Sequence, residues 1–134
     1  MKKLLRGVLV DVEKETASIV EIPDELDEFY RILNCDCIDI VSRRIGKHSS
    51  GRQKRYNIVC DDEGLFKDPQ KISAINNLGQ PQLVGNLFIV GGTDQDGNLT
   101  SLWDSDIMWI LDKVQKMSTR KFPAGYPILT QCEY

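Results

Sequence analysis

Five short apolar runs separated by turn-forming residues constrain the fold of this 134-residue chain more than any other feature of its sequence. The runs cover residues 4–12, 16–22, 37–45, 54–60 and 83–92. The first, LLRGVLVDV, is nearly continuous in leucine and valine, which is typical of a strand covered on both faces. Polar residues join the first two runs, and glycines and serines join the next two, so each pair predicts a β-hairpin. We therefore expect a fold built around a β-sheet.

Two other segments show the periodicity of helices. Residues 22–34 place Pro23 and Asp24 at a helix start, and acids follow in the first turn, where the helix dipole favours them. Residues 104–117 predict a second helix, capped by Asp104 or a neighbour, with Trp109 opposite its apolar stripe. The prolines and the NNLG turn signal within residues 65–82 predict an irregular loop, and the DG turn in residues 93–103 predicts a hairpin turn leading into a short strand.

These elements predict an α+β fold in which an antiparallel or mixed sheet of about six strands carries two packed helices. Residues 1–117 are expected to form a single α+β domain, since the chain length suits one core. Residues 118–134 contain two prolines and, among other residues, the large apolar side chains of Phe122, Tyr126, Ile128 and Leu129. We expect them to form an extended C-terminal tail that packs back on the domain, with Trp109 as one candidate for what it covers.

Composition excludes some classes of protein. The net charge is -3, and no apolar stretch approaches the roughly 18 residues of a membrane span, so no membrane association is expected. Four cysteines without a recognisable secretory signal favour a reducing compartment, and we expect a cytoplasmic protein. Their spacing does not match a zinc site. No metal or other cofactor is expected. The cysteines are Cys35, Cys37, Cys60 and Cys132.

The acidic cluster Asp61, Asp62 and Glu63, followed by Gly64, comes closest to resembling a site. Consecutive side chains leaving a strand do not converge as the ligands of a metal must. Asp and Gly are also the residues that form turns, so a turn is the favoured interpretation and functional carboxylates the alternative.

Three further side chains join these acids as candidates for contact with a partner or ligand: Asn86, Trp103 and Trp109. A tryptophan opposite an apolar stripe either packs under the chain's own tail or anchors a partner, and the tail is favoured. The only histidine, His48, lies in a long hairpin connection beside two serines, which is poorly suited to hold a base and a nucleophile. We therefore expect no catalytic residues.

Charge is distributed unevenly. Residues 11–28 hold eight acids and one base, whereas residues 43–55 hold six bases and no acid. On a hairpin tip these bases are candidates for binding nucleic acid. The segment has no aromatic side chain to stack on bases, and the domain is acidic overall, so this partner is possible but not favoured. Contact with the acidic first third of the chain is an equally plausible role. The candidates are Arg43, Arg44, Lys47, Arg52, Lys54 and Arg55.

The order of four motifs resembles a known family. GVLVDVEKETASIVEI with the helix start after it, YNIVCDDEGL, LVGNLFIVGG and DGNLTSLWDSDI follow one another as in the bacterial and phage family of the domain of unknown function 3846. The resemblance covers residues 4–116 and leaves the tail outside. It implies a small accessory protein of plasmids, conjugative elements or phages, and it implies no activity and no catalytic residues. Members often have threonine as the helix cap where this chain has Trp103, so the cap must come from elsewhere.

We therefore expect a small non-catalytic binding or accessory protein of a bacterial mobile element or phage that acts on a protein partner or a small ligand. One alternative is a nucleic-acid-binding factor that uses the basic hairpin of residues 43–55. A weaker alternative is a metal-dependent enzyme that uses Asp61, Asp62 and Glu63.

Overall fold

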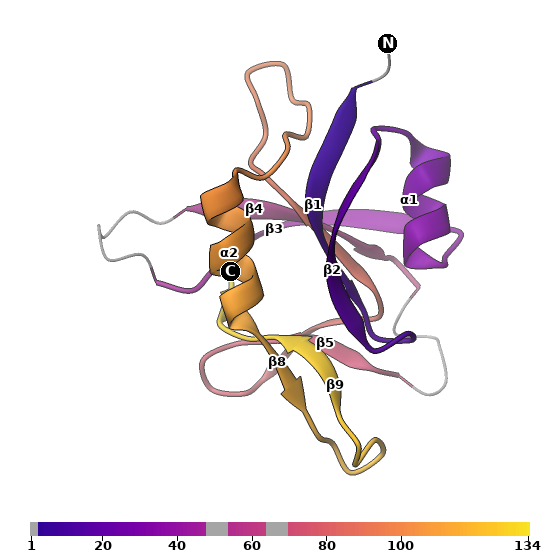
Figure 1. The fold of residues 1–134 in the computed structure, drawn as a ribbon, viewed down its shortest axis with the longest axis vertical. Helices are drawn as coiled ribbons and strands as arrows, with labels where there is room; N and C mark the ends of the chain where they lie inside the picture. The colour runs from indigo at the N-terminus through magenta and orange to yellow at the C-terminus, as the bar shows by residue number, and fades with distance from the viewer. Residues whose placement is uncertain (1–2, 48–53, 64–69) are drawn as a thin grey trace.

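The computed structural model describes residues 3–47, 54–63 and 70–134. Strands dominate these ranges, and two helices accompany them (Figure 1). The predicted α+β class is confirmed. In chain order the elements are β1 (Leu4–Asp11), β2 (Thr16–Pro23), α1 (Leu26–Leu33), β3 (Ile38–Ile45), β4 (Arg55–Asp61), β5 (Ile72–Ile75), β6 (Pro81–Val84), β7 (Leu87–Val90), α2 (Asp104–Lys113), β8 (Val114–Met117), β9 (Tyr126–Leu129) and β10 (Cys132–Glu133).

The larger sheet has six strands in the order β10-β3-β4-β7-β1-β2. All of its neighbouring strands are antiparallel. The two predicted hairpins, β1 with β2 and β3 with β4, pair along their lengths. The run at residues 83–92 supplies the central strand β7, which lies between β4 and β1. Gly85, just before β7, has a φ of 78°, a backbone conformation that favours glycine.

A second sheet corrects the prediction of a single sheet. Its four strands lie in the order β6-β5-β9-β8, and β5 with β9 is its one parallel pair among the described residues. β5 and the first two residues of β6 come from residues 65–82, so the prediction that this whole stretch is an irregular loop is wrong. The other two residues of β6, Leu83 and Val84, come from the run at residues 83–92 that was predicted as one strand. Pro81 was read as a sign against a strand. A proline is tolerated there because β6 is an edge strand, on which one side of the backbone has no neighbouring strand to bond.

The second helix is shorter than its periodicity predicts. It ends at Lys113, and Val114 takes extended backbone angles, φ -87° and ψ 123°. Residues 114–117 continue as β8 because they pair with β9 over four positions. Tertiary pairing therefore overrides the helix propensity of Gln115, Lys116 and Met117. The strand expected after the DG turn reduces to a single bridge between Thr93 and Leu99.

The first helix begins later than predicted, whereas α2 begins at Asp104 as predicted. Pro23 ends β2, and α1 begins after Glu25, which makes no side-chain cap. Asp104 does not cap α2 either, since its carboxylate pairs with Arg6. The residue before α2 is Trp103, and its backbone N–H donates to Asp106 Oδ2 at 3.4 Å. In place of a threonine cap, the carboxylate of Asp106 in the first turn of α2 thus bonds to the backbone before the helix.

The six-stranded sheet is covered on both faces. Along β4, Tyr56, Ile58 and Cys60 face a core shared with the second sheet and α2. Val59, between them, faces a smaller core beneath α1. Figure 1 shows α1 on one side of the sheet, with α2, β8 and β9 on the other. Because successive strand residues point to opposite faces, a strand buried on both faces needs the continuous apolar runs that mark this sequence.

The C-terminal tail forms two strands. Residues 118–134 contribute β9, which joins β8 to β5, and β10, which pairs with the end of β3. Tyr126, Leu129 and Cys132 of this segment are buried in the core that the second sheet shares with α2. The tail therefore supplies both a central strand of one sheet and an edge strand of the other.

Candidate functional site

A groove of about 340 Å³ lies where the two sheets meet along β3 and β6. Three of its lining residues come from β3, three from the end of β4 and its turn, and four from β6. Its volume falls at the lower end of the range for sites that hold small ligands. The lining residues are Asp39, Val41, Arg43, Cys60, Asp61, Asp62, Pro81, Gln82, Leu83 and Val84.

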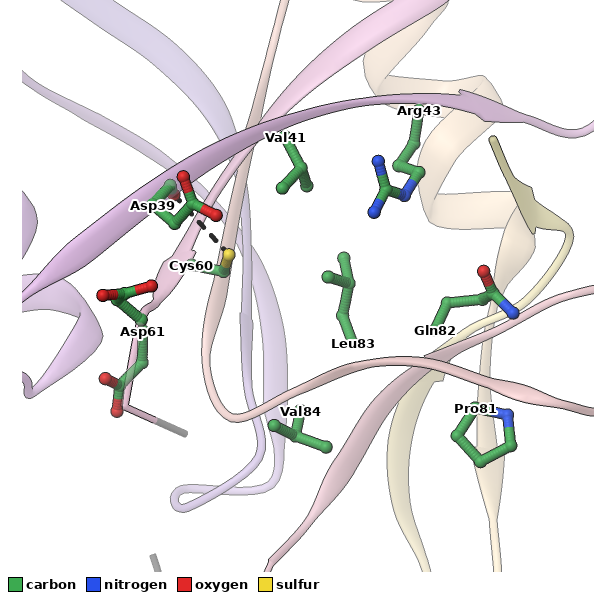
Figure 2. Close-up of a pocket in the computed structure, with 10 residues that line it drawn as sticks. Asp39, Val41, Arg43, Cys60, Asp61, Pro81, Gln82, Leu83 and Val84 are labelled. Atoms are coloured by element: carbon green, nitrogen blue, oxygen red, sulfur yellow. Dashed lines mark hydrogen bonds between the residues drawn. The ribbon is translucent and has the colours of Figure 1, made fainter. Parts of the chain in front are cut away.

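The groove has an apolar middle and two charged ends. Asp39, Val41 and Arg43 are alternate residues of β3, so all three side chains point to the same face of the sheet. Figure 2 shows Val41 facing Leu83 across the groove, with Arg43 at one end and Asp39 and Asp61 at the other. The arrangement offers acceptors for a cation at one end and donors for an anion at the other.

The predicted turn at the acidic cluster is present. Asp61 Oδ1 accepts a hydrogen bond from the Glu63 N–H at 2.9 Å, which is the local side-chain contact that builds such turns. Asp61 is 6% exposed, whereas Asp62 and Glu63 are exposed. Asp62 lines the groove, and Glu63 lines a separate hollow beside α1. The three acids therefore do not act as one cluster, although two of them contribute to the acidic end of the groove.

Cys60 lies at the acidic end and donates its thiol to the backbone oxygen of Asp39 at 3.5 Å, drawn as a dashed line in Figure 2. Burial, together with the neighbouring acids, raises the pKa of this thiol to about 12. The thiolate is the nucleophilic form of cysteine, so near neutral pH Cys60 is a weak nucleophile.

Arg43 forms the cationic end. Its guanidinium lies over the Tyr134 ring, with 4.1 Å between Cζ and the ring centroid, and its Nη1 donates to the backbone oxygen of Ser42 at 3.0 Å. Its Nε is buried, and no described residue accepts a hydrogen bond from it. A buried donor without an acceptor costs about 1–3 kcal/mol, which a bound anionic group could recover.

The cations predicted to bind nucleic acid do not form one patch. Arg44 and Arg55 are cross-strand neighbours on the face of the sheet opposite to that of Arg43, because Arg43 and Arg44 are consecutive residues of one strand and consecutive side chains point to opposite faces. Arg44 Nε donates to the Tyr134 backbone oxygen at 2.6 Å, and Arg55 Nη1 approaches Ser42. Lys47 is exposed, and the candidate Arg52, like His48, falls outside the described residues.

Lys54, the remaining basic candidate, belongs to a network that attaches α2 to β4. Its Nζ lies 2.6 Å from Asp106 Oδ1, which also accepts a hydrogen bond from the Tyr56 hydroxyl at 3.1 Å. Asp106 is 4% exposed, and Tyr56 is fully buried. Burial and the Asp106 carboxylate both raise the pKa of the Tyr56 phenol above its ordinary value. Lys54 therefore serves the packing of the helix.

The remaining predicted ligand residues also lie away from the groove. Asn86 accepts from the Val12 N–H at 2.9 Å and donates to the Leu33 carbonyl at 3.3 Å, so its amide joins the residue after β1 to the end of α1. Trp103 is 76% exposed at the start of α2.

Trp109 packs at the end of β3. Its Nε1 donates to the Ile45 carbonyl at 2.7 Å. A Cβ added at Gly46 would lie 2.8 Å from the Trp109 ring. The Lys113 ammonium lies 4.3 Å from the centroid of the same ring. The indole is thus used to hold α2 against the larger sheet.

Sequence reasoning missed Asp39, Val41, Tyr134 and the β6 residues as parts of one site. The signal available on β3 was the alternation of an acid, an apolar residue and a base at residues 39, 41 and 43. Nothing local indicated that residues 81–84 lie opposite them, because β3 and β6 belong to different sheets.

In the ranges that the structure describes, no group of three or more His, Cys, Asp or Glu side chains is placed to hold a metal ion. Neither α1 nor α2, the helices of the described ranges, has the length and apolar character that crossing a membrane requires.

Comparison with known proteins identifies a family. No curated protein and no solved structure matches the chain significantly. A protein-family model described as Domain of unknown function (DUF3846) matches residues 5–115. The match includes β1 to α2 and ends inside β8, before the tail strands β9 and β10. It covers most of the chain, and so the chain belongs to the family of the domain of unknown function DUF3846.

Proposed function

We propose that this domain is a non-catalytic binding protein that takes an elongated ligand, with opposite charges near its two ends, into the groove between β3 and β6. The observation that carries the proposal is the apolar stretch of Val41, Leu83 and Val84 between the acids at one end and Arg43 at the other. Apolar walls with a few placed charges are the usual make-up of a ligand site, in which the charges fix orientation.

The distance between the two charged ends sets the length of the ligand. Asp39 and Arg43 are four residues apart on one strand, so their Cα atoms are separated by about 13 Å. The unbonded Nε of Arg43 favours an anion such as a carboxylate at that end. Asp39, Asp61 and Asp62 favour an ammonium or guanidinium at the other.

The chemistry of the groove favours binding over catalysis. Its described lining contains one thiol, that of Cys60, and burial with nearby acids keeps the pKa of this thiol at about 12. A protonated thiol beside carboxylates suits contact with a cation better than nucleophilic attack.

The test uses aminodecanoic acid, a zwitterion with an apolar chain and no peptide group, and follows backbone amide signals by NMR. Decylamine and decanoate, each with one of the two charges, serve as ligand controls. We expect signals of residues 39–43 and 81–84 to shift with the zwitterion, and each single-charge compound to bind several-fold more weakly.

Two variants test the cationic end. Arg43→Gln should weaken binding of the zwitterion to the level seen with decylamine. Arg44→Gln is the matched control, because Arg44 occupies the same strand on the opposite face. The proposal is overturned when none of these compounds shifts the groove signals, or when both variants affect binding equally.

A further inference from the structure

β3 pairs with β4 on one side from Ile38 to Arg44, and on its other side it is covered only at its end. β10 pairs with β3 through Ile45 and Arg44 alone. Among the described residues no strand pairs with the outer side of residues 38–43. This uncovered stretch, which we call the open edge of β3, runs beside the groove.

The hydrogen bonds at the end of β3 show which backbone groups point outward along this edge. The Gly46 N–H donates to the Gln131 carbonyl on the β10 side at 2.9 Å. In an antiparallel pair the outward-facing residues recur every second position. The N–H and C=O groups of Ser42 and Ile40 therefore point outward, toward the position that a further strand would occupy.

Two of these outward groups are bonded by the chain's own charged side chains. Asp39 Oδ1 accepts from the Ile40 N–H at 2.9 Å. Arg43 Nη1 donates to the Ser42 carbonyl at 3.0 Å, and Arg55 Nη1 approaches the same oxygen at 3.4 Å. A carboxylate oxygen thus stands where the carbonyl of a paired strand would be, and a guanidinium N–H stands where its amide would be. Both charged groups also line the groove.

We infer that the ligand is an extended peptide segment of another protein that adds as an antiparallel strand to the open edge of β3. The inference rests on the proposed binding function of the groove. The peptide's backbone replaces Asp39 at Ile40 and Arg43 at Ser42, and the two released side chains then meet the peptide's own side chains. Addition of a strand to an exposed sheet edge is a recurring mode of peptide recognition.

Charge complementarity defines the peptide. Directly opposite residues of an antiparallel pair share a face, so the side chains that enter the groove oppose Arg43, Val41 and Asp39 in that order. The fitting peptide therefore has an acid, an apolar residue and a base at alternate positions. The intervening residues lie on the other face, where Ile40 is 44% exposed, and they should be apolar.

The experiment uses the blocked hexapeptide Glu-Val-Val-Val-Lys-Thr, which begins opposite Arg43 and leaves Arg44 to its pairing with β10, titrated into the protein by calorimetry and NMR. Its first and third valines would direct their N–H groups to β3, and the N–H of its central valine would point away. We expect N-methylation of the first or third valine to weaken binding at least about tenfold, since it removes a backbone bond and adds a clash. N-methylation of the central valine, the matched control, should change affinity by less than about threefold, because no bond to β3 is lost. A peptide with Glu and Lys exchanged should bind at least about tenfold more weakly, because both charge contacts become repulsive.

A variant of the protein tests the same bond from the other side. Ile40→Pro removes the outward N–H, and an edge strand tolerates this change because the group does not bond to β4. It should weaken the peptide at least about tenfold but change aminodecanoic acid binding less than about threefold, because that ligand has no backbone to pair with Ile40 and Asp39 keeps its charge. Ile40→Val should preserve binding of both. The N-methylated peptides supply the same test should the proline variant not fold.

The outcomes separate the two proposals. Strand addition is overturned when aminodecanoic acid binds but the peptide does not. It is also overturned when N-methylation, or exchange of Glu and Lys, leaves the affinity of the peptide unchanged. Both results leave the proposed function of the groove in place. Failure of both ligands overturns both. Sedimentation that reveals a dimer abolished by Ile40→Pro would show that a second copy of the chain occupies the edge, and it would overturn the assignment to a foreign peptide.

Discussion

Removing the buried Asp106 carboxylate should be among the most damaging single changes to α2. In Asp106→Ala the Tyr56 hydroxyl, fully buried and bonded to Asp106 at 3.1 Å, loses its acceptor. A buried hydroxyl left unpaired costs about 1–3 kcal/mol. The lost ion pair adds at most about 1 kcal/mol, because the Lys54 side chain is 46% exposed and stays in water.

The bond from the Trp103 N–H is long, at 3.4 Å, and its loss adds little. We therefore expect the free energy of unfolding to fall by about 2–4 kcal/mol. Urea denaturation followed by circular dichroism measures this change as a lower midpoint at unchanged slope. Asp104→Ala is the matched control, since that carboxylate belongs to the same helix turn but its side chain is 83% exposed, and it should cost less than about 1 kcal/mol.

A double-mutant cycle separates the hydroxyl from the charge. Tyr56→Phe removes the group that Asp106→Ala leaves unpaired, so the double variant should be about 1–3 kcal/mol more stable than the sum of the two single changes predicts. Additive effects, or an Asp106→Ala loss no greater than that of Asp104→Ala, would refute the reasoning that the buried hydroxyl dominates the cost.

Three further predictions concern tight packing and buried thiols. Gly7→Ala should destabilise the protein by about 3 kcal/mol in urea denaturation, because its Cβ would lie 2.2 Å from the Ile89 carbonyl oxygen in the central sheet; a loss below 1 kcal/mol would contradict it. Gly46→Ala should cost about 1–3 kcal/mol by the same assay, since φ is 71° and the Cβ would meet the Trp109 ring; Gly97→Ala, with a similar φ and open space, isolates the backbone part. Burial raises the pKa of both Cys60 and Cys132 from 9.0 to about 12. Between pH 9 and pH 12 the thiols therefore ionise in the unfolded chain but stay protonated in the folded protein. The free energy of unfolding should fall over this range by up to about 1.4 kcal/mol per pH unit for each thiol. Denaturation of the Cys60→Ala and Cys132→Ala variants across this range should show a flatter slope than the parent.

The elements that could be predicted from the sequence are those whose conformation depends on residues close together in the chain. β1, β4 and β7 were predictable because each is buried on both faces and each therefore carries a nearly continuous apolar run that can be recognised in the sequence. The turn at Asp61 was predictable for a similar reason, since it depends on a side-chain contact only two residues long. Helix α1 followed from its apolar stripe.

β5, β6 and β8 were not predictable in this way. Each is a four-residue strand, and its extended conformation is stabilised by a partner elsewhere in the chain. Val114 shows the conflict directly, because its helical periodicity persists while its pairing with Leu129 makes it a strand. Short segments have too little intrinsic preference to resist such pairing.

The candidate site could likewise be predicted only in part. Sequence alone determined that residues 39, 41 and 43 share a face, because side chains alternate along any strand. It also determined that Arg43 and Arg44 point to opposite faces, which divides the basic segment that sequence reasoning had treated as one. Only the tertiary structure decided that β6 lies across from that face and that the pairing of β10 with β3 ends at Arg44. The open edge of β3 and the groove therefore lie side by side. The physical reason is that the period of a strand is a property of its own backbone, whereas its neighbours are chosen by the burial of the whole core.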